Sequence, residues 1–137
     1  MTVQYNGRDG YYEVREKLSN SQTLEMRFDA YGGETDKTIN YWVSLSIYNK
    51  RKHAGLNEEK KLSTGTNPIE SILVAQKAFN MLEQRVVEDA HRYDEDINII
   101  VGWVDNRRRD AYNKVLSRKG FTFGTYNNFK VLRKHYG

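Results

Sequence analysis

The segment LSTGTNPIE offers the first recognisable chemistry in the sequence, because it has the composition of a helix start. Asn67 is a residue type that caps helices, Pro68 suits the first helical position, and Glu70 can bond back to the cap. The N-terminus of a helix binds phosphate well, because its backbone N–H groups point outward and its dipole favours negative charge. The segment therefore predicts a helix from Pro68 with a phosphate-binding end.

Positive charge is concentrated in the last third of the chain. The whole sequence has a net charge of +4, yet Asn106 to Gly137 holds nine Lys or Arg residues and one acid. This asymmetry indicates a partner that carries phosphate, either a nucleic acid or a phosphorylated cofactor, although a solvated basic face explains it equally well. The candidate nucleic-acid contacts are Arg107, Arg108, Arg109, Lys130, Arg133 and Lys134, interleaved with Tyr112, Tyr126, Phe129 and Tyr136.

Composition excludes several other kinds of site. The chain has no cysteine, which rules out disulfide and thiol chemistry and fits a cytoplasmic protein. Its histidines (His53, His91 and His135) lack the spacing of metal ligands, so we predict no metal site. No apolar run approaches the roughly 18 residues that cross a bilayer, so we expect no membrane partner. A length of 137 residues with one proline predicts a single domain over residues 1–137.

The stretch from Asp96 to Phe121 gives the clearest structural pattern. Residues 97–104 are mostly apolar and predict a strand that is buried on both faces. Residues 107–119 then have helical spacing of apolar side chains, and Gly120 fits the left-handed position that ends a helix. A further strand is expected to start at Phe121.

The rest of the chain predicts an antiparallel meander, a long helix and a final hairpin. Alternating apolar residues indicate strands near 24–30 and 41–47, whereas 11–18 permits either a strand, which we favour, or a helix. The long helix should run from Pro68 to about His91, and Asn127-Asn128 should form the hairpin turn. We therefore expect a mixed α+β fold with one sheet and two main helices, and with strand 97–104 central and parallel to a neighbour.

This order of elements resembles the GCN5-related N-acetyltransferase fold over roughly residues 40–137. The resemblance implies that acetyl coenzyme A is the cofactor and that a small-molecule or protein amine receives the acetyl group. It implies that the loop before the long helix holds the pyrophosphate, and the matching residues are Ser63, Thr64, Gly65, Thr66 and Asn67. Gly120-Phe121 matches the Gly-Phe pair that ends the second helix of the family.

The sequence departs from the family at two places. The family loop usually has two glycines after a basic residue or Gln, whereas LSTGTNP has one glycine. The tyrosine that commonly acts as general acid stands four residues before the Gly of Gly-Phe, where this chain has Leu116. Tyr112, one turn earlier, is the candidate replacement, with a core aromatic as the alternative. Glu25, expected on the wet face of its strand, is the candidate for removing a proton from the amine through water.

A second function from a different class remains open on the same scaffold. The single-glycine loop favours a non-catalytic module that binds nucleic acid through the basic last third of the chain. A protein-interaction module is also compatible with the sequence, because fold alone does not determine function.

Overall fold

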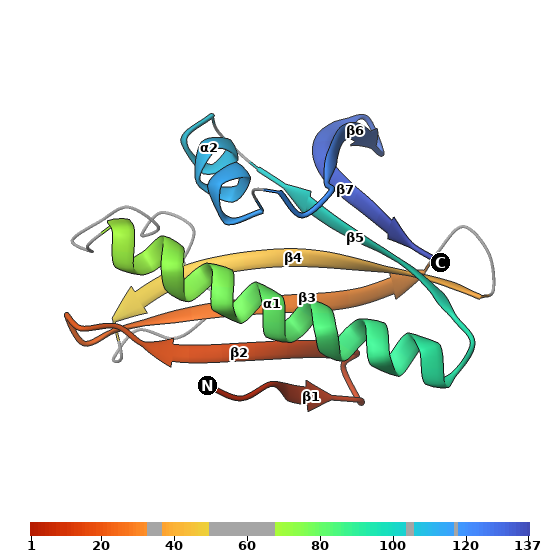
Figure 1. Cartoon of the computed structure of the whole chain (residues 1–137), viewed down its shortest axis with the longest axis horizontal. Coiled ribbons are helices and arrows are strands. Elements are labelled where there is room, and N and C mark those ends of the chain that lie inside the picture. The colour runs from red at the N-terminus through yellow and green to blue at the C-terminus, as the bar shows by residue number, and fades with distance from the viewer. Residues whose placement is uncertain (33–36, 50–67, 104–105, 117) are drawn as a thin grey trace.

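A computed structural model describes residues 1–32, 37–49, 68–103, 106–116 and 118–137 of the chain. Seven strands form one mixed sheet in the order β1-β2-β3-β4-β5-β7-β6, and α1 lies across one of its faces (Figure 1). The fold is mixed α+β, as predicted. The elements are β1 (Gln4–Asn6), β2 (Tyr11–Lys17), β3 (Gln22–Gly32), β4 (Thr38–Asn49), α1 (Pro68–Arg92), β5 (Asp96–Gly102), α2 (Asn106–Val115), β6 (Thr122–Tyr126) and β7 (Phe129–Tyr136).

The pairing of β4 with β5 is the one parallel contact among the described strands. It runs from the pair Thr38 and Asp96 to the pair Val43 and Val101, and the other strand pairs are antiparallel. The helix α1 makes the crossover between these two strands, as parallel pairing requires. β5 lies between β4 and β7, so the prediction of a central strand with a parallel neighbour is confirmed.

Alternate side chains of β2, β3 and β4 bury one face of the sheet against α1. Phe28 of β3 and Phe79 of α1 are fully buried, and their ring centroids lie 5.4 Å apart. The helix contributes a stripe at three- and four-residue steps, as predicted from Phe79 onward, whereas Ile69 and Leu73, which have the same spacing, are exposed. Other buried members of this core are Val14, Leu24, Met26, Leu45, Ile47, Ala78, Leu82, Val86, Ile97 and Ile99.

Two tyrosines of the sheet also hold α1 in place. The Tyr12 hydroxyl donates a hydrogen bond to Asp89 at 2.6 Å, and the Tyr136 hydroxyl donates one to Glu83. Glu83 and Asp89 therefore lie on the side of α1 that contacts the sheet. Burial, together with these acidic partners, raises the pKa of both tyrosines.

The segment after β5 differs from the prediction in length. α2 ends at Val115 rather than at residue 119, and the backbone then takes left-handed φ values of 64° at Arg118 and 84° at Gly120. A left-handed non-glycine residue cannot continue a helix. Gly120 is left-handed, as predicted, but it does not end the helix, which stops five residues earlier. The predicted hairpin is confirmed, and its Asn127 and Asn128 have φ values of 49° and 69°. The three-residue β1 was not predicted.

Candidate functional site

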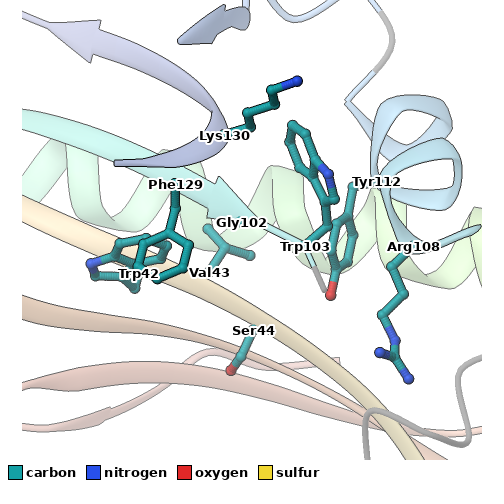
Figure 2. A pocket seen from close by; sticks show the side chains of 9 residues that line it. All are labelled: Trp42, Val43, Ser44, Gly102, Trp103, Arg108, Tyr112, Phe129 and Lys130. Atoms are coloured by element: carbon teal, nitrogen blue, oxygen red, sulfur yellow. The ribbon is translucent and has the colours of Figure 1, made fainter. Parts of the chain in front are cut away.

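A cleft of about 310 Å³ opens where β4 and β5 stop pairing. The pairing ends at Val43 and Val101, and β4 then continues to Asn49 with β3 as its only described partner strand. The carboxyl ends of neighbouring parallel strands are the usual place for a ligand crevice in sheets that contain such strands. Figure 2 shows the lining residues, which are Trp42, Val43, Ser44, Gly102, Trp103, Arg108, Tyr112, Phe129 and Lys130.

The position of Trp42 depends on a glycine of the neighbouring strand. A Cβ atom added at Gly102 would lie 3.0 Å from Cζ3 of Trp42, which is closer than an ordinary van der Waals contact. The Trp42 ring is also nearly parallel to the Tyr31 ring at 5.8 Å and edge-on to the Tyr126 ring at 5.5 Å. This packing gives the cleft a fixed aromatic wall. Sequence reasoning missed Gly102 and Trp42, because the contact joins residues far apart in the chain.

Tyr112 lies in the wall of the cleft, although it is also a core aromatic. It comes from α2, is 7% exposed and stands with Arg108 on the side of the cleft opposite Trp42 and Phe129 (Figure 2). Leu116, one turn later, is buried in the core and does not line the cleft. Tyr112 can therefore be both a core aromatic and a candidate catalytic residue, since its ring packs in the core while the residue borders the cleft.

The six candidate nucleic-acid contacts do not form one surface. Arg108 and Lys130 line the cleft, but Arg109 pairs with Asp110 at 3.1 Å. Arg133 and Lys134 are consecutive in β7 and so point to opposite faces of the sheet, and Lys134 donates a hydrogen bond to a backbone carbonyl at 2.7 Å. Arg107 is exposed and lies outside the cleft.

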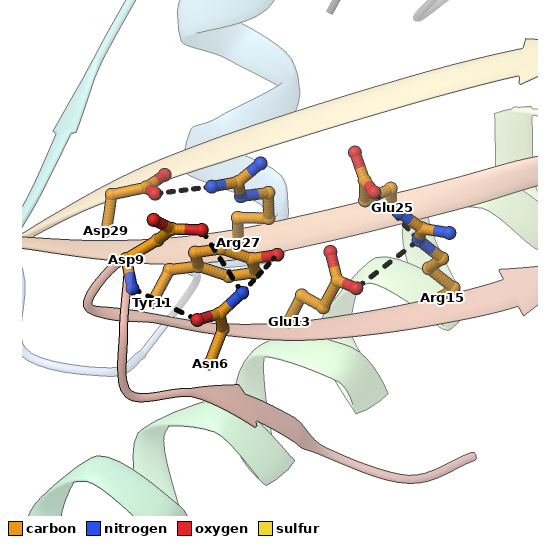
Figure 3. Close-up of polar contacts among 8 residues, drawn as sticks. All are labelled: Asn6, Asp9, Tyr11, Glu13, Arg15, Glu25, Arg27 and Asp29. Atoms are coloured by element: carbon orange, nitrogen blue, oxygen red, sulfur yellow. Dashed lines mark hydrogen bonds and ion pairs between the residues drawn. The ribbon is translucent and has the colours of Figure 1, made fainter. Parts of the chain in front are cut away.

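Glu25 is not on a wet face, so that part of the prediction was wrong. The residue is 6% exposed and accepts a hydrogen bond from Arg15 Nε at 2.9 Å, with Glu13 beside them (Figure 3). Burial raises the pKa of the Glu25 carboxyl, and the neighbouring Arg15 opposes this rise. Strand alternation correctly placed Glu25 on the face of the sheet opposite to that of Leu24 and Met26. It could not show that Arg15 pairs with the carboxylate on that face. Glu25 also does not line the cleft.

The predicted pyrophosphate loop, Ser63, Thr64, Gly65, Thr66 and Asn67, lies outside the described residues. The helix does begin at Pro68, as predicted, and Gln76 Nε2 of α1 donates a hydrogen bond to the Lys114 carbonyl of α2 at 3.0 Å. The N-terminal part of α1 therefore lies beside α2, at the same end of the sheet as the last residues of β4 (Figure 1). Glu70 accepts hydrogen bonds from the backbone and side chain of Ser19.

The described part of the chain lacks two other features. It contains no group of three His, Asp or Glu residues placed to hold a metal ion. In the same residues, neither helix combines the length and the apolarity needed to cross a bilayer.

Comparison with family models, curated proteins and solved structures gives no match to this chain. The geometry of the cleft is therefore the basis for assigning a function.

Proposed function

We propose that the chain is an acetyl-coenzyme-A-dependent N-acetyltransferase of the GCN5-related kind. The observation that carries the proposal is the cleft at the end of the β4–β5 pairing, with Tyr112 in its wall. The acceptor is an amine on a small molecule or a protein. A cytoplasmic location remains a prediction from the lack of cysteine.

The residues of the cleft fit the reactive end of the cofactor. A volume of about 310 Å³ is at the small end of the range for ligand pockets, so the cleft suits the acyl end and part of its arm rather than the whole nucleotide. Trp42, Trp103 and Phe129 supply apolar wall, while Arg108 and Lys130 supply charged hydrogen-bond donors for the carbonyl oxygens of the acyl group and the arm. The predicted loop before α1 is the proposed site for the pyrophosphate.

Side chains of the cleft position the cofactor and transfer a proton during the reaction. When bound, the cofactor supplies an activated acyl group as a thioester. The aromatic walls exclude water and orient the ligand, and such positioning lowers the barrier by removing translational freedom before the reaction. Tyr112 is the proposed general acid, since a tyrosine hydroxyl can give a proton to a leaving thiolate. We no longer propose Glu25 as the base, because it is buried in an ion pair away from the cleft lining.

Thermal unfolding with and without acetyl coenzyme A tests this proposal. Binding to the folded state should stabilise the protein by about 2.7 kcal/mol at a hundredfold excess over Kd. Arg108→Gln should weaken binding about tenfold, as expected for a lost charge-assisted contact, whereas Arg107→Gln, outside the cleft, should not. The absence of any shift at millimolar cofactor would remove the enzyme proposal.

A nucleic-acid-binding module is the second candidate function, and the residues of the cleft also support it. Arg108 and Lys130 lie beside the aromatic rings of Trp103 and Phe129, a combination that suits a phosphate next to a stacked base. Binding of a labelled single-stranded oligonucleotide at about 50 mM salt distinguishes the two candidates. Tight binding that falls steeply with salt, without any effect of acetyl coenzyme A, would favour this candidate.

A further inference from the structure

The two edge strands of the sheet are protected to different extents. β1 has three residues, whereas β6 at the opposite edge has five and, among the described strands, pairs only with β7. Natural edge strands usually avoid further pairing by being short, or by carrying charge or proline. β1 is short, but β6 has the sequence TFGTY, without any charge or proline. β6 is therefore the less protected edge.

The geometry of the hairpin determines which backbone groups of β6 point outward. Asn127 and Asn128 both have left-handed backbones, as in the two-residue type I′ turn. In such a hairpin the flanking residues Tyr126 and Phe129 exchange both backbone hydrogen bonds, and every second residue of the strand does the same. Phe123 and Thr125 are the intervening residues. Their N–H and C=O groups therefore point away from β7, towards the open edge.

Side chains around this edge are apolar and basic. Phe123 is 64% exposed and meets Trp103 only edge-on, with ring centroids 6.0 Å apart. Lys130 is exposed and is the cross-strand partner of Thr125, and Arg118 is exposed just before the strand. Neither Lys130 nor Arg118 forms an ion pair with another described residue. The edge thus combines outward hydrogen-bonding groups, an exposed aromatic ring and uncompensated positive charge.

We propose that β6 is a docking edge for an extended acidic segment of a partner protein, which adds to the sheet as an eighth strand. Main-chain hydrogen bonds supply affinity in this mode of recognition, and side chains supply specificity. Acidic residues of the segment complement Lys130 and Arg118, and its apolar residues cover Phe123. The proposal does not depend on the acetyltransferase activity, although Lys130 borders both the cleft and this edge.

Two other occupants fit the edge less well. A second copy pairing through β6 would bring two basic regions together, because Asn106 to Gly137 has nine Lys or Arg residues and one acid. Like charges across an interface are unfavourable. A nucleic acid would meet the cations, but phosphate oxygens only accept hydrogen bonds. The outward C=O groups of Phe123 and Thr125 need donors, which a peptide backbone provides.

Peptide binding measured by fluorescence anisotropy and by amide hydrogen exchange tests the proposal. The probe is a blocked ten-residue peptide of alternating Glu and Val, in about 50 mM salt. We expect saturable binding and at least about tenfold slower exchange of the Phe123 and Thr125 amides, because each becomes hydrogen-bonded. The same peptide with alternate N-methylated residues should not bind. A peptide with Lys in place of Glu should bind at least about tenfold more weakly.

Variants of the chain separate the edge from general electrostatics. The double variant Arg118→Glu and Lys130→Glu should weaken binding about tenfold or more. The matched control, Arg8→Glu and Lys17→Glu, makes the same change in net charge with exposed residues near the other edge, and should bind nearly as the parent does. Thr125→Pro should remove binding, since proline lacks the outward N–H and is tolerated at edges.

Several results would overturn the proposal. They are unchanged binding of the N-methylated peptide, equal effects of the two double variants, exchange protection outside β6, or no binding at millimolar peptide. A dimer in solution with protected Phe123 and Thr125 amides would assign the edge to a second copy. An oligonucleotide that protects the same amides would assign it to nucleic acid.

Discussion

The space between β4 and β5 is closed at one end of the strand pair and open at the other. At the paired end Asn98 Nδ2 donates a hydrogen bond to Asn40 Oδ1 at 2.9 Å, and Asn98 Oδ1 lies 2.8 Å from Nδ1 of His135. Asn40 and Asn98 are only 1% and 2% exposed. At the other end the cleft opens beside Trp42 and Gly102. One end is thus closed by satisfied polar groups, whereas the other is kept open by large rings.

The difference indicates where the sheet tolerates change. Buried amides that are fully hydrogen-bonded specify a unique arrangement, and losing one partner leaves the others unsatisfied. The cleft is instead lined mainly by aromatic and cationic side chains, so their replacement should affect ligand binding more than folding. The predictions below test this contrast from the largest expected effect to the smallest.

Asn98→Ala should cause the largest loss of stability. The substitution removes one hydrogen-bond partner of the buried Asn40 and one of the exposed His135, and a lost hydrogen bond at a buried polar group costs about 1–3 kcal/mol. We therefore expect the free energy of unfolding, measured in urea, to fall by about 1–3 kcal/mol. Ser44→Ala at the open end is the control, and it should change this free energy by less than about 0.5 kcal/mol. Equal losses in the two variants would contradict the contrast.

Tyr112→Phe should lower turnover while leaving the fold intact. If Tyr112 gives a proton to the leaving thiolate, acetyl transfer should slow by about a hundredfold or more, because general acid catalysis typically contributes that much. Steady-state kinetics with an amine acceptor measure the change, and KM for acetyl coenzyme A should stay nearly constant. Leu116→Ala is the comparison, because Leu116 lies in the core rather than the cleft and its loss should act on stability. Unchanged turnover in Tyr112→Phe would remove Tyr112 from catalysis.

Gly102→Val should move the aromatic wall of the cleft. The new side chain would collide with Trp42, and overpacking of this kind typically costs about 1–3 kcal/mol. We expect a change in tryptophan fluorescence together with weaker binding of acetyl coenzyme A. Gly102→Ala, which adds the Cβ alone, should have a smaller effect in the same direction. Identical fluorescence in parent and Gly102→Val would show that Trp42 does not contact this position.

Glu25→Gln should alter the pH dependence of stability by the smallest amount. Glu25 pairs across the strands with Ser46, on the half of β4 beyond the end of its pairing with β5. Its raised pKa means that the folded state retains a proton that the unfolded state has already lost. Stability from this group is therefore present below the ordinary glutamate pKa and is lost as pH rises through the raised pKa.

Urea unfolding measured between about pH 4 and pH 7 checks this sign. The parent should lose stability as pH rises just above the usual glutamate range, and the Glu25→Gln variant should lack that part of the slope. Arg15→Gln should raise the pKa of Glu25 further, because Arg15 favours the charged carboxylate. The same slope in parent and Glu25→Gln would assign the titration to another group.

Local patterns in the sequence predicted the helices and strands, but they could not predict contacts between segments that are far apart in the chain. Alternation in β3 and β4, the helical stripe of α1 and the turn at Asn127-Asn128 are set by neighbouring residues, so they could be read from the sequence. The parallel pair followed from the strand–helix–strand order. The end of α2 was placed too late, because apolar spacing gives no sign of a left-handed Arg118.

The candidate site was only partly predictable. Tyr112 and the basic residues Arg108 and Lys130 were identified from their types, but nothing in the sequence showed which of the six cations share a cleft. Gly102 and Trp42 became visible only through their contact, which depends on the register of the parallel strands. Glu25 has the pattern of an exposed residue, and its burial with Arg15 is a tertiary effect.

The crossover between β4 and β5 also has a consequence for the order of events during folding. Asn40 and Asn98 are 58 residues apart in the chain. The intervening segment must therefore lose conformational entropy before their hydrogen bond can form. The β6–β7 hairpin closes over two residues and can form in about 1–10 μs. Pairing of β4 with β5 should therefore be a late step that waits for α1 to dock. Substitutions at Asn98 should then accelerate unfolding more than they slow folding.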